Sequence, residues 1–181
     1  MHCCWQWRLR RPQRLLSRSS SWPRPTSRAA APWRRRKCLT VSAAPGNISL
    51  ALSWSGEPAG TQSFAIMMFD SDARAGSGWW HWTVFNIPAS VHSLPAGVGS
   101  DASKDLPTGA VQGRNDFGFS FYGGPCPPVG EHAHHYEITV YALKVPKLDL
   151  DASAPGAKVG SELRANALES AMIAGRYERA K

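Results

Sequence analysis

The sequence lacks several features that would define its class at once. It contains no run of about 18 apolar residues, so we expect no segment that spans a membrane. Arginines interrupt every short apolar run near the N-terminus, which excludes the hydrophobic core of a secretory signal. The four cysteines (Cys3, Cys4, Cys38 and Cys126) form no CxxC pair, so neither a disulfide framework nor a zinc site is indicated.

Acidic residues are absent from positions 1–37, which hold 11 of the 21 lysines and arginines. Positions 38–181 carry all 13 acidic residues and ten basic ones. This part is therefore slightly acidic and lacks the charge of a nucleic-acid binder, so we expect no nucleic-acid partner.

We expect residues 1–45 to be a basic leader without regular structure, and residues 46–181 to form one domain. The leader is a translated stretch outside the native protein, an organellar transit peptide, or a basic arm for anionic surfaces. The expected location is the cytoplasm, or an organelle if the leader is a transit peptide.

Hydrophobic patterning predicts a mainly β or α+β domain. Four segments have the alternating or continuously apolar composition of strands, and they are residues 47–56, 63–70, 79–87 and 135–145. Residues 88–128 are rich in Gly, Pro and Asp and predict a long irregular loop. Residues 156–180 predict a closing helix, because one helical stripe contains Leu163, Ala167, Ser170, Ala171 and Ala174.

Histidines occur in two of the predicted strands. Strict alternation puts Trp79 and His81 on one face of their strand, and Trp80 and Trp82 on the other. If the two histidine-bearing strands are neighbours, His81 and His134 converge. The simpler alternative is that His81 is a half-buried histidine whose hydrogen bonds are all satisfied.

Two further segments point to the same place. Asp70 and Asp72 end the strand 63–70, and the sequence YGGPCPPVG at 122–130 is suited to curl over the histidines. Its glycines permit close backbone approach and expose N–H donors. The sequence HAHH at 132–135 is an alternative metal site, but no third ligand lies nearby in the sequence.

Four motifs follow one another in the chain: D-x-D-A-x from Asp70, W-x-H from Trp79, GGPCPP from Gly123 and H-x-Y from His134. In this order they resemble the phosphatidylethanolamine-binding protein family, in its bacterial Raf-kinase-inhibitor-like branch. The resemblance runs from about residue 46 to the C-terminus. It implies a central antiparallel sheet, a second small sheet and a C-terminal helix. It also implies a pocket for anions such as phosphate or a phosphorylated head group.

Carried over by position, the pocket residues implied by the resemblance are Asp70, Asp72, Trp79, His81, Tyr122, Gly124, Cys126, Pro127, His134 and Tyr136. We expect His81 and His134 to donate hydrogen bonds to the anion, each held in its protonated form by a carboxylate. Trp79 would exclude water from the pocket. Phosphate should then bind more tightly as the pH falls from about 8 to 6.

The chain departs from the family pattern in three places. Ser71 and Arg74 replace prolines, which should loosen the acidic loop. Arg74 is either a phosphate contact or a solvated side chain. Phe121 stands where the family usually has glycine, and it would be strained if its φ is positive. The leader shows no counterpart of the family's first strand, which predicts an exposed or incomplete sheet edge.

We therefore predict a non-enzymatic protein that binds a small phosphorylated or anionic ligand, without metal or cofactor. A protein kinase or another protein is a candidate partner. The alternatives are a phosphoester hydrolase with His81 or His134 as general base, with or without a metal, and a protease inhibitor. The chain offers no G-x-S-x-G or H-E-x-x-H motif for a hydrolase.

Overall fold

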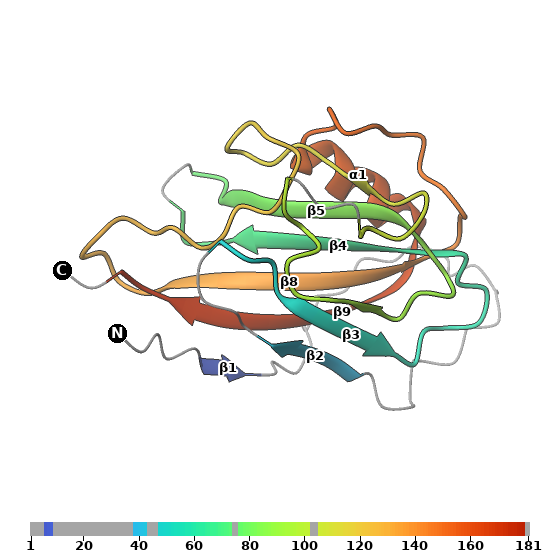
Figure 1. Cartoon of the computed structure of the whole chain (residues 1–181), viewed down its shortest axis with the longest axis horizontal. Helices are drawn as coiled ribbons and strands as arrows, with labels where there is room; N and C mark the ends of the chain where they lie inside the picture. The colour runs from blue at the N-terminus through green and yellow to red at the C-terminus, as the bar shows by residue number, and fades with distance from the viewer. Residues whose placement is uncertain (1–5, 9–37, 43–46, 74–75, 102–104, 180–181) are drawn as a thin grey trace, which may run out of the picture.

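The computed structural model describes residues 6–8, 38–42, 47–73, 76–101 and 105–179. They form two antiparallel sheets and one helix (Figure 1). The larger sheet has the strand order β1-β9-β8-β4-β5-β7. Its strands are β1 (Gln6–Arg8), β9 (Ala167–Tyr177), β8 (His134–Leu143), β4 (Ser63–Asp70), β5 (Trp79–Pro88) and β7 (Val111–Gln112). The smaller sheet has the order β2-β3-β6, with β2 (Cys38–Ser42), β3 (Ala51–Ser55) and β6 (Ser93–Leu94).

The central strand β4 is buried on both faces, as its continuous apolar sequence predicts. Ile66 and Met68 pack with residues of the small sheet in one apolar cluster. Ala65 and Met67 pack with the helix α1 (Gly156–Asn166) in a second cluster. The larger sheet is thus the middle of three layers. The predicted class, mainly β with a second small sheet and a late helix, is confirmed.

A β-bulge interrupts β5 at His81. Met68 pairs with Trp82 but the next residue, Phe69, pairs with Trp80, so His81 is an extra residue in β5. Trp80 packs on the helix side and Trp82 on the small-sheet side. The prediction that Trp80 and Trp82 share a face is therefore wrong, because one inserted residue reverses the alternation. Bulges commonly redirect a side chain beside a functional site.

The predicted closing helix is correct only in its first half. The helix α1 ends at Asn166, and the following residues form β9, which pairs with β8 along its whole length. The alanine-rich sequence has strong helix propensity, but ladder hydrogen bonds with β8 and the burial of Ile173 and Gly175 outweigh it.

The segment 1–45 contains a strand where the sequence predicts none. Cys38–Ser42 forms β2 and pairs with β3, and Gln6–Arg8 forms β1 beside β9. The rest of the segment 1–45 lies outside the described residues. None of the helices in the described part of the chain is long and apolar enough to span a membrane.

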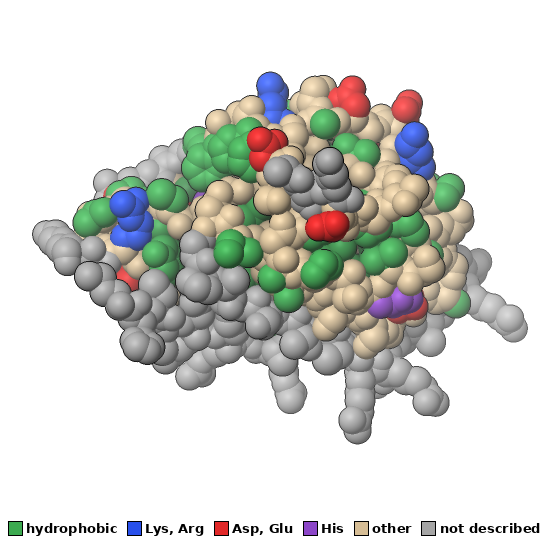
Figure 2. Space-filling model, in the orientation of Figure 1, with side chains coloured by type: hydrophobic (Ala, Val, Ile, Leu, Met, Phe, Trp, Pro, Cys, Tyr) green, Lys and Arg blue, Asp and Glu red, His purple; other side chains and the backbone are tan. Residues whose placement is uncertain are grey.

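Lysine and arginine side chains of the described residues lie apart from one another on the face seen in Figure 2. Acidic side chains are interspersed with them on the same face. This distribution agrees with the balanced charge of residues 38–181.

Candidate functional site

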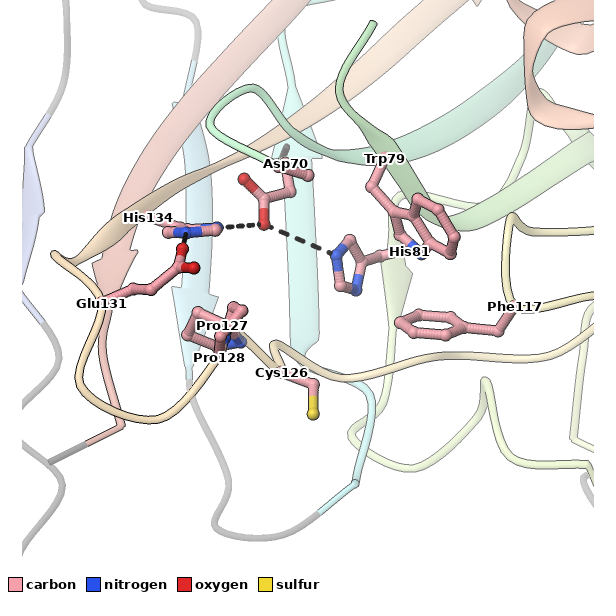
Figure 3. Close-up of a pocket in the computed structure, with 10 residues that line it drawn as sticks. Asp70, Trp79, His81, Phe117, Cys126, Pro127, Pro128, Glu131 and His134 are labelled. Carbon is pink, nitrogen blue, oxygen red and sulfur yellow. Dashed lines mark hydrogen bonds and ion pairs between the residues drawn. The ribbon is translucent and has the colours of Figure 1, made fainter. Parts of the chain in front are cut away.

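A cavity of about 270 Å³ opens where β4 ends, beside the start of β5 and β8 (Figure 3). Asp70, His81 and His134 come from strands, and a proline-containing segment before β8, which also carries Glu131, closes the cavity. The residues that line it are Asp70, Ala73, Trp79, His81, Phe117, Cys126, Pro127, Pro128, Glu131 and His134.

Asp70 lies between the two histidines. Its Oδ2 accepts a hydrogen bond from His134 Nδ1 at 2.8 Å and lies 3.9 Å from His81 Nε2. The histidines thus converge, although β5 and β8 are not neighbours, because β4 runs between them and ends in Asp70. The bulge at His81 turns its imidazole toward the same face as Asp70.

His134 is bonded to carboxylates through both ring nitrogens. Nδ1 pairs with Asp70, and Nε2 lies 3.2 Å from Glu131 Oε2. Burial lowers the pKa of His134, but the hydrogen bonds to Asp70 and Glu131 outweigh it and raise the pKa above its ordinary value. In the protonated form of His134, both ring N–H groups donate within the protein, to Asp70 and to Glu131.

His81 has a different environment. Its Nδ1 lies 3.0 Å from the carbonyl oxygen of Gly123 and 3.2 Å from that of Gly124, so Nδ1 carries the proton. Burial lowers the pKa of His81, and the Gly123 carbonyl and the charge of Asp70 do not offset it. The lowered pKa favours the neutral ring, whose Nε2 lies 3.9 Å from Asp70 Oδ2.

Asp72 does not line the cavity. Its Oδ2 accepts hydrogen bonds from the backbone N–H and from Nδ1 of His135, at 2.7 and 2.6 Å. Partial burial raises the pKa of Asp72, but the bond to His135 outweighs it and the pKa is lowered. Asp72 therefore pairs with His135, and the carboxylate that lies near both cavity histidines is Asp70.

Three other predicted site residues lie just outside the cavity. Tyr122 packs edge-on against Trp82, with ring centroids 5.5 Å apart. Gly124 contributes its carbonyl oxygen to His81. Tyr136 is fully buried with its ring 5.2 Å from His81, and its hydroxyl has no hydrogen-bond partner within the described residues. Burial, followed by the charge of Asp70, raises the pKa of Tyr136.

Sequence reasoning missed four lining residues, namely Ala73, Phe117, Pro128 and Glu131. Phe117 contacts Trp79 and His81 edge-on, at centroid distances of 5.4 and 5.2 Å. It belongs to a segment with no regular pattern, where only the alternating phenylalanines of NDFGFSF gave a signal. Glu131 is signalled only by its position three residues before His134.

Asn115 holds the Phe117 segment against β5. Its buried amide donates to the carbonyl oxygens of Phe121 and His81, at 2.8 and 3.3 Å. Its Oδ1 accepts from the backbone N–H groups of Phe117 and Phe119. One side chain therefore joins the aromatic wall of the cavity to the strand that carries His81.

The departures from the family pattern have separate outcomes. Arg74 lies outside the described residues, and the N–H of Ser71 donates to the carbonyl oxygen of His135 at 3.2 Å. Phe121 is not strained, because Asn86 is the one non-glycine residue with a positive φ in the described part of the chain.

The charged groups of the cavity differ from those of a simple anion-binding site. Among the described lining residues, Asp70 and Glu131 carry carboxyl groups and His81 and His134 carry imidazoles, and the Arg179 guanidinium donates to Cys126 Sγ at 3.3 Å. Within the described residues, no group of three His, Cys, Asp or Glu side chains is arranged to hold a metal ion. The carboxylates on both nitrogens of His134 leave it without a metal-binding lone pair.

Comparison with known proteins shows clear relatives. The profile described as "Phosphatidylethanolamine-binding protein" matches residues 32–178. The chain is 54% identical over 133 residues to the UPF0098 protein YbcL of Escherichia coli K12, covering 74% of this chain and 73% of YbcL. It is 46% identical over 131 residues to YbhB of the same organism, covering 72% of this chain and 82% of YbhB.

Solved structures agree with these matches. The crystal structure of YbcL, described there as a new member of the mammalian PEBP family, aligns with a TM-score of 0.71 over 73% of this chain and 80% of YbcL. The PEBP homologue CT736 from Chlamydia trachomatis is 29% identical and aligns with a TM-score of 0.62, over 73% of this chain and 82% of that one.

Proposed function

The chain belongs to the phosphatidylethanolamine-binding protein family, and we propose that its cavity binds a small phosphorylated or otherwise anionic group without converting it. The observation that carries this proposal is the convergence of His81 and His134 on Asp70 at the wall of the cavity. An imidazole on each side of one buried carboxylate is an arrangement that can place protonated nitrogens toward an anion.

His81 is the donor that this proposal requires. Its Nδ1 is held by the carbonyl oxygens of Gly123 and Gly124, so a second proton has only Nε2 as its position. A protonated Nε2 donates to an anion in the cavity. Trp79 and Phe117 wall this side, which reduces access of water and strengthens the hydrogen bond.

Sulfate binding is expected to tighten as the pH falls from 8 to 5.5. Sulfate keeps its charge over this range, so a change in affinity reflects protonation of the protein and not of the ligand. An anion favours the protonated form of His81, and affinity therefore rises as the pH falls through the His81 pKa, which is lowered from 6.5. One coupled proton gives at most about tenfold per pH unit. The slope should be steepest above the His81 pKa of the free protein and should flatten below it, and titration calorimetry measures it.

His81→Gln should bind weakly at every pH, with a flat profile. His92→Gln is the matched control, because His92 is exposed and pairs with Glu57. Wild-type affinity that is constant or decreases toward pH 5.5 would contradict this role of His81.

Phosphoesters are expected to remain intact in the presence of the protein. Among the described residues that line the cavity, none is a serine, threonine or lysine, and the thiol of Cys126 accepts a hydrogen bond from Arg179. Incubation with p-nitrophenyl phosphate, with and without a chelator, should release no nitrophenolate above buffer. Turnover that disappears in His81→Ala would replace the binding proposal with the hydrolase.

Inhibition of a protein kinase or of a protease stays a prediction. It follows from the resemblance alone, and no contact among the described residues bears on it. The cytoplasmic location likewise stays a prediction.

A further inference from the structure

We propose that Glu131 is an internal anion that occupies the ligand position on His134, and that an anionic ligand displaces it. This inference rests on the proposed function and names the residue that regulates access to the site. Glu131 lines the cavity, and its Oε2 lies 3.2 Å from His134 Nε2 (Figure 3).

The two carboxylates on His134 are not equivalent. Asp70 ends β4 and takes Nδ1, the nitrogen on the strand side. Glu131 reaches His134 from the segment before β8, and it takes Nε2. Since Nδ1 is committed to Asp70, an anion can bond to His134 only through Nε2. The Glu131 carboxylate therefore has the same acceptor chemistry and the same position as a ligand oxygen.

Glu131 is also the carboxylate that can leave. Its side chain is 14% exposed, whereas that of Asp70 is 4% exposed. Glu131 belongs to no strand or helix, and it follows Gly130, whose φ of 80° lies in the left-handed region. Moving its carboxylate to solvent keeps His134 Nε2 paired, provided that a ligand oxygen takes its place. Asp70 has no such route, because it is enclosed between strands.

Displacement changes the charge that the ligand meets. With Glu131 in place, an incoming anion meets two carboxylates beside His134, those of Asp70 and Glu131. With Glu131 in solvent, Asp70 is the one of these two that stays at the cavity. A phosphate group carries more negative charge than a carboxylate and offers three acceptor oxygens, so it competes better for His134. The site should then select phosphorylated small molecules over carboxylic acids.

Glu131→Gln tests the proposal. Glutamine has the same shape and its amide oxygen still accepts from His134, but the competing charge is gone. At pH 7 we expect inorganic phosphate to bind at least about tenfold more tightly than in the wild type. Acetate should gain as well, so the preference for phosphate should shrink.

Glu137→Gln is the control, because Glu137 lies on β8 but does not line the cavity. Equal phosphate affinity in the wild type and in Glu131→Gln would overturn the inference and leave the proposed function standing. Weaker binding in Glu131→Gln would also overturn it, because Glu131 would then support the ligand. Binding in the variant alone would support the internal anion and contradict phosphate binding by the wild type. No binding by either would contradict both.

Discussion

Asp70→Asn is expected to lower the free energy of unfolding by about 3 kcal/mol at pH 6, the usual cost of removing one partner of a buried ion pair. In the wild type the backbone N–H of Asp72 donates to Asp70 Oδ1 at 2.9 Å, and asparagine keeps an oxygen for this bond. It cannot balance the cationic ring of His134, whose Nδ1 lies 2.8 Å from Asp70 Oδ2. Urea denaturation followed by tryptophan fluorescence measures the loss.

The loss of unfolding free energy in Asp70→Asn should be larger at low pH than at high pH. The raised pKa of His134 contributes stability that is present below its unfolded value and is lost as the pH rises through the folded value. The wild type and Asp70→Asn should therefore differ more at pH 6 than at pH 9. His81, whose pKa is lowered, acts in the opposite direction in the wild type as the pH falls below 6.5.

Asp149→Asn is the matched control for this experiment, because Asp149 is exposed. It should change the free energy of unfolding by less than about 0.5 kcal/mol. If Asp70→Asn were as stable as this control at pH 6, the bridging role of Asp70 would be wrong. The variant should also bind phosphate poorly, since its imidazoles lose the charge that favours protonation.

The central strand and the meeting of the histidines could be predicted because their signals are local. The run SFAIMMFD defines a strand buried on both faces, and Asp70 ends it. His134 and Tyr136 alternate regularly along β8. The family motifs then placed these residues in one pocket, and the cavity contains His81, Asp70 and His134.

The bulge at His81 could not be predicted in the same way. The sequence GWWHWTVF alternates without a break, and only the register against β4 shows that His81 is an extra residue. Register depends on a partner strand elsewhere in the chain. For the same reason the alanine-rich residues after Asn166 read as helix, although pairing with β8 makes them a strand.

The missed cavity residues come from segments without periodicity. Phe117 and Glu131 each lie outside regular secondary structure, where side-chain direction follows from hydrogen bonds between distant residues. Glu131 is the most consequential of these residues. It pairs with His134 Nε2, the nitrogen that the sequence analysis assigned to the ligand. Asp72 was misplaced because its partner, His135, is adjacent in sequence to His134 but points elsewhere.

Asn115→Ala is expected to destabilise the protein by about 3 kcal/mol, because it removes four hydrogen bonds to buried or part-buried backbone groups. The lost bonds are those to the carbonyl oxygens of His81 and Phe121 and from the N–H groups of Phe117 and Phe119. Phosphate affinity should fall as well, since the aromatic wall is no longer tied to β5. Urea denaturation and titration calorimetry measure the two effects.

Asn166→Ala is the control for Asn115→Ala. It measures the effect of removing an asparagine amide that does not belong to the Asn115 network. Asn166 makes one bond within its own helix, to the carbonyl oxygen of Glu162 at 3.0 Å. Alanine is the better helix former, so this change should cost less than about 0.5 kcal/mol. Near-equal stability of the two variants would mean that water replaces the Asn115 bonds. The network would then be no more than a local turn, and the wall formed by Phe117 would need another support.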